Sequence, residues 1–465
     1  MIAIAVLGVL SLIFLVVVVR LHAFVALLLV SMGVGLAAGM SFQEVLQSTQ
    51  TGMGNILGYI AVVVGLGAMF GQMLESTGGA QRLAHTLVKT FGVSRASWAL
   101  TLAGFLIAIP VFFEVGFVIL IPLVYSLAKT NKRSVLCYAI PLVAGLAVAH
   151  AFIPPTPGPM AAAGILGADL GRVIVYGVIA GLPAAILAGP VWGNFIGSKI
   201  EAPLPSHVEL TEETNPDELP SFGLVFGLLL VPILLIVANT VSNSMAPPDL
   251  ENLAYEASRA RVVARFFAFA GHPFVALMMA TLLSFYFLGI RRGYSLSEVQ
   301  VLANKSLGPA GMIILVTGAG GVFKQVLTDS QIGESLARSL VDVGMTPVSL
   351  AFCVAAVVRV SQGSATVAMM TAAGLVGGVL ELAREAPAGD PMAAFAQADL
   401  ALITIAIAAG STVLSHVNDS GFWLIKEFLG LTEAETLKSW TVMTTIVGVV
   451  GLASAWMVSL VLGQL

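Results

Sequence analysis

His22-Ala-Phe-Val-Ala-Leu27 returns later in the sequence as His272-Pro-Phe-Val-Ala-Leu277, with five of six positions identical at an offset of 250 residues. A longer match follows at a constant offset of 253. It pairs Gly65, Gly67, Phe70, Gln72, Leu74, Leu83, Ala84, Leu87 and Val88 with Gly318, Gly320, Phe323, Gln325, Leu327, Leu336, Ala337, Leu340 and Val341. Apolar residues coincide often by chance, but paired His, Phe and Gln residues do not. The sequence therefore predicts an internal duplication, which decides the architecture.

The composition around this repeat is that of a membrane protein. The 465 residues are 58% hydrophobic and 10% charged, and the mean hydropathy is +0.98. Soluble domains carry about 25% charged residues. Apolar runs of about 20 residues, enough to cross the hydrocarbon core as a helix, recur along the chain. We therefore expect an all-α polytopic membrane protein, and the net charge of -4 without a basic patch excludes nucleic acid as a partner.

Each half shows the same order of segments: three spans, a hairpin, a span with a helix-breaking core, and a final span. The first half places them at 2–20, 22–40, 54–75, 97–128, 134–168 and 173–197. The second half places them at 221–243, 267–290, 307–327, 347–382, 395–430 and 441–462. A re-entrant hairpin adds no net crossing, so each half crosses an odd number of times. The second half then starts from the opposite side, which is the inverted repeat of many secondary transporters.

The predicted domains follow from this repeat. Residues 1–200 form the first inverted repeat, 201–220 an acidic, Pro-containing cytoplasmic linker, and 221–465 the second repeat with an extramembrane insertion near 244–265. Thirteen Lys and Arg residues fall on the linker's side and six on the other, which places both termini outside the cell. Two distant cysteines without metal-site spacing give no reason to expect a metal or a disulfide.

Two stretches interrupt apolar spans and are candidates for a binding site. Pro154-Pro-Thr-Pro-Gly-Pro159 must break its helix, because proline lacks an N–H group and clashes with the preceding turn. Ser415-His-Val-Asn-Asp-Ser-Gly421 occupies the corresponding place in the second half. Irregular backbone at membrane depth is tolerated only where protein or a water-filled cavity surrounds it. The two breaks are therefore expected to face one cavity, the alternative being that each is a surface loop.

The centres of the two hairpins are the other candidates. Ser361-Gln-Gly-Ser-Ala-Thr366 offers hydroxyl and amide groups at an expected helix N-terminus, where N–H groups and the helix dipole attract an anion such as a carboxylate. The first hairpin carries Glu114 within Phe112-Phe-Glu-Val-Gly-Phe117. A bare carboxylate at that depth is costly, so Glu114 is expected to be protonated, paired or functional.

Two basic residues and two histidines lie near these features. Arg359 and Lys324 each cost about 2.5 to 3.5 kcal/mol to insert. Either residue can form an ion pair with Glu114 or Asp419, or bind the substrate. For Arg359 both roles stay open. Lys324 is interpreted as a structural residue or as part of the ion coupling. His150 and His416 flank the breaks, where each is either hydrogen-bonded to a neighbour or a proton carrier.

These motifs resemble those of the gluconate:proton symporter family, the gluconate permeases and their relatives in the ion transporter superfamily. The resemblance covers both halves. It lies in Phe113-Glu-Val-Gly-Phe117, His150-Ala-Phe-Ile-Pro-Pro-Thr-Pro-Gly-Pro159, Gly320-Gly-Val-Phe-Lys-Gln-Val-Leu327, Arg359-Val-Ser-Gln-Gly-Ser-Ala-Thr366 and Ser415-His-Val-Asn-Asp-Ser-Gly-Phe-Trp423. It implies proton-coupled uptake of gluconate or a related hydroxy-carboxylate across a bacterial inner membrane. Thr156 replaces a histidine of well-known members, so a small amino acid such as D-serine remains an alternative substrate.

The predicted mechanism is an elevator-like or rocking symporter driven by protons, with sodium as an alternative coupling ion. No cofactor and no enzymatic activity are expected. The protein is expected to be a monomer or a homodimer. The expected substrate-binding residues are Thr156, Gly158, Arg359, Ser361, Gln362, Gly363, Ser364, Thr366, Asn418 and Asp419. The expected proton-coupling residues are Glu114, Asp419, His150 and His416. An anion channel is the rival from another class, and an intramembrane enzyme ranks last because no catalytic signature is present.

Overall fold

The computed structural model describes residues 2–202, 218–245, 259–330, 345–384 and 397–463, together with Ile332 and Phe395. All regular structure in these residues is helical. Nine of the described helices are long and apolar enough to cross a membrane, or ten if the bent pair Gly79–Phe91 and Val93–Ile107 forms one span. The prediction of an all-α polytopic membrane protein is confirmed.

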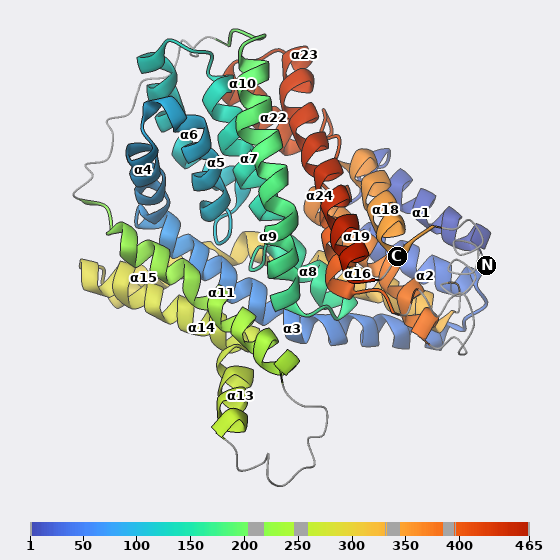
Figure 1. Ribbon diagram of the computed structural model, residues 1–465. Coiled ribbons are helices and arrows are strands. Elements are labelled where there is room, and N and C mark those ends of the chain that lie inside the picture. Colours follow the sequence, from blue (N-terminus) through green and yellow to red (C-terminus); the bar gives the residue numbers. More distant parts are fainter. Residues whose placement is uncertain are drawn as a thin grey trace.

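The helices of the first half follow the predicted order (Figure 1). They are α1 (Ile2–Val17), α2 (Ala23–Ala37), α3 (Phe42–Ser76), α4 (Gly79–Phe91), η1 (Val93–Arg95), α5 (Ala96–Ile107), α6 (Phe113–Asn131), α7 (Leu136–Phe152), α8 (Pro157–Leu166), α9 (Leu170–Ile186), η2 (Leu187–Val191) and α10 (Trp192–Gly197). The short π-helical turn η2 joins α9 to α10 as one long span.

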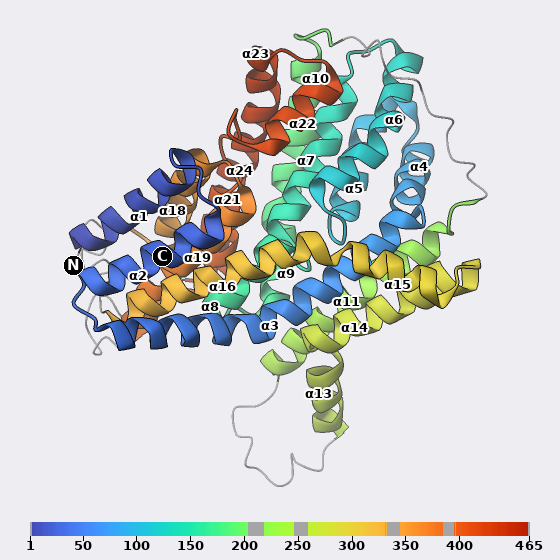
Figure 2. The ribbon, with the colours of Figure 1, turned by 180° about the vertical axis from the view of Figure 1, so that it is seen from behind.

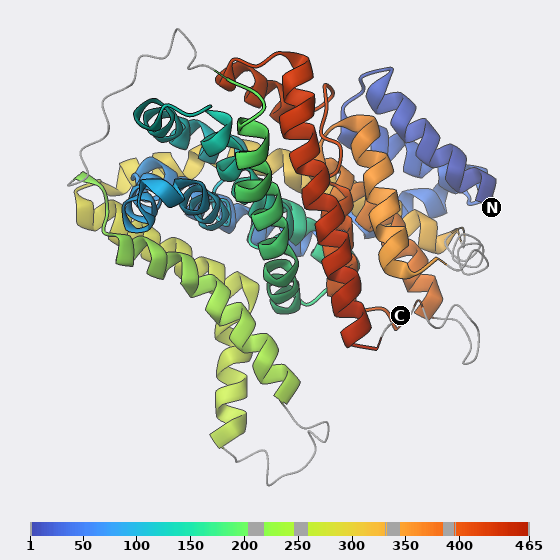
Figure 3. The same ribbon diagram turned by 45° about the horizontal axis from the view of Figure 1, so that its top comes forward.

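The described helices of the second half repeat this order. They are α11 (Phe222–Met245), α13 (Arg259–Ala270), α14 (Pro273–Ser284), η4 (Phe285–Gly289), η5 (Ile290–Arg292), α15 (Leu296–Lys305), α16 (Leu307–Asp329), α18 (Pro347–Gln362), α19 (Ala365–Arg384), α21 (Leu400–Gly410), α22 (Ser420–Leu429), α23 (Glu433–Thr436), η6 (Leu437–Thr441) and α24 (Val442–Val461). The helices α9 and α24, which end the two halves, lie side by side (Figure 3).

Helices that the predicted duplication matches begin in the same way. His22 and His272 cap α2 and α14, and each imidazole Nδ1 accepts a hydrogen bond of 3.3 Å from the backbone N–H two residues later. Ser41 and Ser295 precede α3 and α15 and form a capping box at the start of each helix. The Ser hydroxyl accepts from the backbone N–H of the Glu three residues later, and the carboxylate of that Glu accepts from the Ser backbone N–H. His22 and His272 therefore have a structural role, as helix caps.

The long helix α3 differs from the predicted span because it begins at Phe42 rather than near 54. Its first three turns are polar, so hydropathy alone did not include them. At 1.5 Å per residue its 35 residues extend about 50 Å, well beyond the hydrocarbon core of about 30 Å. The helices α3, α11, α14, α15 and α16 run across the base of the bundle in the view of Figure 1.

The matching helices α3 and α16 run antiparallel to each other. The Ser48 hydroxyl near the start of α3 donates to Asp329 Oδ2 at the end of α16, at 2.5 Å. Gly52 lies so close to α16 that a Cβ atom there would be 2.6 Å from the Gly321 carbonyl oxygen. Small residues permit such close approach of membrane helices. Antiparallel packing of two equivalent helices favours the inverted repeat, which stays a prediction.

Both predicted hairpins are present as helix–turn–helix units. The first joins α5 to α6 through residues 108–112, and the second joins α18 to α19 through Gly363 and Ser364. Gly363 has φ +83° and touches the second break, because a Cβ atom there would lie 2.0 Å from the Asn418 carbonyl oxygen. The second arms are 19 and 20 residues long, enough to cross a membrane, so re-entry of the hairpins stays a prediction.

Both predicted helix breaks are confirmed. Residues 153–156 separate α7 from α8 and contain a cis peptide bond between Pro154 and Pro155. Proline at the first position of α8, Pro157, restarts the helix at no cost in hydrogen bonds. Residues 411–419 separate α21 from α22. Both breaks adjoin buried helix segments near the middle of the molecule.

The predicted linker and insertion are described only in part. The acidic linker residues Glu209, Glu212, Glu213 and Asp217 lie outside the described residues. At the end of the linker, Arg82 Nε donates to the Pro220 carbonyl oxygen at 2.7 Å. The described part of the insertion is α13, which projects away from the rest of the bundle (Figure 2). The domain boundaries and the extramembrane placement of the insertion stay predictions.

The contact between α3 and α16 leads to a stability prediction. Replacing Gly52→Ala forces the two backbones apart and should cost about 1 to 3 kcal/mol of unfolding free energy, as overpacking usually does. Gly54→Ala is the matched control, because nothing lies within 4 Å of a Cβ atom there. Thermal unfolding in detergent should show a lower melting temperature for Gly52→Ala alone. Equal melting temperatures would contradict this packing.

Candidate functional site

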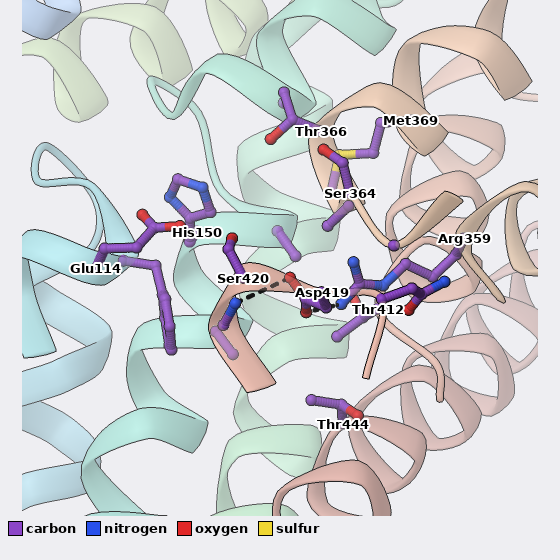
Figure 4. Close-up of a pocket in the computed structure, with 18 of the residues that line it drawn as sticks. Glu114, His150, Arg359, Ser364, Thr366, Met369, Thr412, Asp419, Ser420 and Thr444 are labelled. Carbon is purple, nitrogen blue, oxygen red and sulfur yellow. Dashed lines mark hydrogen bonds and ion pairs between the residues drawn. The ribbon is translucent and has the colours of Figure 1, made fainter. Parts of the chain in front are cut away.

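A cavity of about 320 Å³ lies where the two hairpin tips and the two helix breaks meet (Figure 4). Ten of the predicted site residues line it. They are Glu114, His150, Gly158, Arg359, Gln362, Gly363, Ser364, Thr366, Asn418 and Asp419. The remaining lining residues are Phe113, Ala147, Ala151, Ala365, Met369, Thr412, Ser420, Gly421, Trp440 and Thr444. The volume lies at the lower end of the range for small-molecule sites.

A buried ion pair forms one side of the cavity. The Arg359 side chain at the end of α18 is 4% exposed, and its Nη2 contacts Oδ2 of Asp419, whose side chain is 12% exposed. Asp419 caps α22 through Oδ1, which accepts a 3.0 Å hydrogen bond from Gly421 N–H, and Oδ2 also accepts from the Ser415 hydroxyl. Of the two roles predicted for Arg359, the structure therefore shows the ion pair. Its partner Asp419 is the last residue of the second break.

Some buried polar atoms of the cavity lining have no hydrogen-bond partner among the described residues. These atoms are Arg359 Nε, Gln362 Nε2 and His150 Nδ1. Buried polar atoms in folded proteins are normally paired, with protein groups or with water. The first two are N–H donors. The residues that line the cavity therefore include two buried N–H donors without a partner among the described residues, one of them on the Arg359 guanidinium.

The N-terminus of α19 adds to this preference for negative charge. Ser364, Ala365 and Thr366 start the helix and line the cavity, and the Ser364 hydroxyl accepts from Val367 N–H at 3.3 Å. The first N–H groups of a helix and its dipole favour an anion. Arg359 precedes the turn that begins α19, so the guanidinium and the helix terminus act on the same region of the cavity.

Glu114 and His150 lie across the cavity from the Arg359–Asp419 pair (Figure 4). Glu114 is exposed in the first turn of α6, and its carboxylate has no hydrogen bond or ion pair within the described residues. A second cavity of about 290 Å³, reaching Pro309 and Ile313 of α16, shares Glu114, His150 and Thr366 with the first. These three residues therefore lie on the boundary between two cavities.

Three predicted site residues lie outside the main cavity lining, because their polar groups are bonded to nearby backbone. The Thr156 hydroxyl donates to the Ile153 carbonyl oxygen at 2.6 Å. The Ser361 hydroxyl donates to the carbonyl oxygen one turn earlier at 2.7 Å, and His416 Nε2 lies 3.0 Å from the Val360 carbonyl oxygen. In this conformation Thr156, Ser361 and His416 stabilise the break and the tip rather than face the cavity.

Lys324 is interpreted from the sequence as structural or coupling, with Glu114 and Asp419 as candidate partners. Lys324 Nζ lies 2.6 Å from Glu381 Oε2 and pairs with neither Glu114 nor Asp419. The physical reason is that α16 packs along α19, where Gly377 leaves room for the Lys324 side chain. Lys324 therefore links α16 to the second hairpin away from the cavity.

Several lining residues were not predicted. Trp440 and Thr444 belong to η6 and α24, which read as an uninterrupted apolar span, and Thr412 and Met369 lie among apolar neighbours. Ser415 was part of the predicted break but was not assigned to the site. Only a weak sequence signal indicates that Trp440 and Thr444 line the cavity. Both carry hydrogen-bonding groups and lie one helical turn apart near the start of the last span.

A bundle of apolar helices around a cavity built from broken helices and hairpin tips defines a membrane solute transporter. The chain belongs to the family described as GntP family permease, which matches residues 1–461. This family consists of permeases rather than enzymes, and the protein is a multi-pass membrane protein.

Relatives along most of the chain have names that include their substrates. The low-affinity gluconate transporter of Escherichia coli K12 is 44% identical over 96% of this chain and 95% of its own length. The L-idonate transporter of the Gnt-II system from the same organism is 37% identical, covering 98% of each chain. The gluconate permease of Pseudomonas aeruginosa is 39% identical, covering 95% of this chain and 94% of its own.

Two solved transporters share the fold at low sequence identity. The YdaH transporter of Alcanivorax borkumensis superposes with a TM-score of 0.63 at 14% identity, over 95% of this chain and 98% of that one. MtrF of Neisseria gonorrhoeae gives a TM-score of 0.58 at 16% identity, over 89% and 83% of the two chains. These similarities establish the fold alone.

The ion pair leads to a second stability prediction. Replacing Asp419→Asn leaves Arg359 buried without a counter-charge, which should cost about 3 to 5 kcal/mol in the absence of a ligand. Glu427→Gln is the control, since its 3.0 Å pair with Lys426 is surface-exposed and worth about 1 kcal/mol at most. Unfolding in detergent should separate the two variants clearly. Similar stability would mean that the pair is not held as described.

Proposed function

We propose that this permease carries gluconate or a related sugar acid into the cell together with protons. The observation that carries the proposal is the buried Arg359, which lines a small cavity beside the N-terminus of α19 and whose Nε has no hydrogen-bond partner among the described residues. A carboxylate is the ligand group that this arrangement favours. The names of the relatives, which are transporters of gluconate and L-idonate, support a sugar acid in particular.

In the proposed complex the substrate carboxylate binds Arg359 and the first turn of α19. Its hydroxyl groups meet the Gln362 amide, the Thr366 and Thr412 hydroxyls and Asn418, which line the same cavity. Gly158 keeps one wall open, because a Cβ atom there would lie 2.7 Å from Met369 Sδ. Thr156, Ser361 and His416 act through the backbone segments that they hold, unless a different conformation brings them to the substrate.

In this proposal, proton coupling arises because Asp419 and the substrate carboxylate compete for the Arg359 guanidinium. Asp419 occupies Arg359 in the empty site, and an incoming carboxylate places a second negative charge at the same position. Two carboxylates near one cation in a low-dielectric cavity favour protonation of one of them. Asp419 then takes up a proton, and Glu114 provides the second carrier beside His150. Neutralising a buried carboxylate also removes its cost during the conformational change.

Transport by reconstituted protein tests this proposal. Proteoliposomes with an imposed pH gradient, inside alkaline, should accumulate labelled gluconate or L-idonate, and should stop when the gradient is collapsed. The panel includes glycerate and D-serine, since accumulation of D-serine instead would select the amino-acid alternative. Accumulation driven by a sodium gradient in place of the proton gradient would show that sodium, not the proton, is the coupling ion. Flux independent of any gradient would favour the anion channel.

Glu114 allows a sharper test of coupling. Glu114→Gln keeps the shape of the side chain but cannot release a proton, so proton-driven accumulation should fall to the level of simple equilibration. Exchange of labelled for unlabelled substrate should persist, because Glu114 lies across the cavity from Arg359. Glu427→Gln, an exposed site outside the cavity, is the matched control. Unchanged concentrative uptake by Glu114→Gln would remove Glu114 from the mechanism.

A further inference from the structure

The last span contacts the second helix break through side-chain hydrogen bonds that the proposed transport mechanism does not use. Its π-helical turn η6 carries Trp440, whose Nε1 donates to the Ser415 hydroxyl oxygen at 2.6 Å. Thr441 donates to the Ser415 carbonyl oxygen, and Thr444 accepts from Ser415 N–H at 3.3 Å. Single π-helical turns inside α-helices occur frequently at functional sites. Every hydrogen-bonding group of Ser415 is thus held by η6 and α24 or by Asp419.

The direction of these hydrogen bonds is fixed by chemistry. The indole N–H of Trp440 is a donor only, so the Ser415 oxygen must accept from it. The single hydroxyl hydrogen of Ser415 is then left for Asp419 Oδ2, the same atom that contacts Arg359. Ser415 is 1% exposed and Trp440 is 3% exposed, so water does not compete for this contact. Trp440 therefore aligns a donor with the carboxylate of the ion pair.

The same indole contacts the first hairpin. Its ring centroid lies 5.5 Å from that of Phe113, the residue before Glu114. A Cβ atom placed on Gly421, whose N–H donates to Asp419, would lie 3.4 Å from Cζ2 of Trp440. Trp440 thus packs on the residue before Glu114 and lies beside a residue that is hydrogen-bonded to Asp419.

We propose that Trp440 is a positioning residue that, through Ser415, holds Asp419 on Arg359 and so sets how easily a substrate carboxylate replaces it. The proposal rests on the proposed function, in which that replacement starts transport. Without the indole N–H, nothing fixes the direction of the Ser415 hydroxyl, and its hydrogen bond to Asp419 Oδ2 is loosened. Asp419 is then held less firmly on Arg359.

The surroundings of Asp419 leave few other titratable groups to produce such an effect. Arg359 from α18 contacts it directly, and Glu114 and His150 face it from across the cavity. On its own side of the cavity, His416 is bonded to the Val360 carbonyl oxygen, and Lys426 pairs with Glu427 and Glu433. A change at Ser415 or Trp440 therefore acts on Asp419 before it acts on any other charged group.

The experiment compares Trp440→Phe, Ser415→Ala and the double variant with the unaltered protein. Phenylalanine keeps an aromatic ring but lacks the N–H, and alanine removes the hydroxyl. Trp192→Phe is the matched control, because Trp192 Nε1 donates to the Ser439 carbonyl oxygen at 3.0 Å, in the same π-helical turn, and does not contact Ser415. Gluconate is the probe, with uptake measured from pH 5 to 9 in proteoliposomes and affinity measured in detergent.

Each single variant should change the pH dependence of uptake and tighten gluconate binding about tenfold, because a hydrogen bond that holds the Asp419 carboxylate is lost in Ser415→Ala and loosened in Trp440→Phe. The double variant should match the single variants, since both remove the same chain of contacts. Trp192→Phe should leave both quantities unchanged. Tighter binding is the decisive sign, because general damage to the site weakens binding.

Three results would overturn the proposal: additive effects in the double variant, the same shifts in Trp192→Phe, or unchanged affinity in both single variants. If Trp440→Phe does not fold, Ser415→Ala alone decides, since it removes a single buried atom. If the unaltered protein shows no pH-dependent uptake, the proposed proton coupling fails, and the positioning role is judged on gluconate affinity in detergent.

Discussion

A buried guanidinium and a buried carboxylate share one contact between the second hairpin and the second broken helix, and the organisation of the site depends on that contact. Each charge alone is costly at this depth, so Arg359 and Asp419 require each other as long as the cavity is empty. The contact holds the end of α18 against the start of α22. Arg359 Nε has no hydrogen-bond partner in the part of the chain that the structure describes, so the pair is complete in charge but incomplete in hydrogen bonds.

The two helix breaks satisfy their backbone in different ways. The first contains Pro154 and Pro155, and Pro157 and Pro159 follow in the first turn of α8; none of these prolines has an N–H group to satisfy. The Thr156 hydroxyl donates to the Ile153 carbonyl oxygen. The second break contains no proline, so its N–H groups need partners. Thr444 and Thr445 on α24 accept from Ser415 and Leu414, and Leu414 adopts a left-handed φ of +49°. The first break is therefore closed by its own composition, and the second depends on the neighbouring span.

This difference explains which parts of the site could be predicted from the sequence. Proline and polar residues within apolar runs indicated both breaks and both hairpin tips, and the cost of charge at membrane depth singled out Glu114 and Arg359. The contacts of Trp440 and Ser415 depend on how α24 packs against the break, and no periodicity within one segment reports that. For Lys324 the sequence indicated a structural or coupling role, but its partner Glu381 is set by the packing of α16 on α19.

The positions that the predicted repeat matches differ between helix starts and the cavity. Matching positions retain the features that start helices, as in the capping His22 and His272 and the capping boxes at Ser41 and Ser295. The positions that face the cavity differ between the halves: the first half supplies the acidic Glu114 with His150, and the second supplies Arg359 with Asp419. A duplicated pair of identical sites would place like charges opposite each other. Divergence at the cavity instead sets an ion pair, Arg359 with Asp419, across from an acidic residue, Glu114, beside His150.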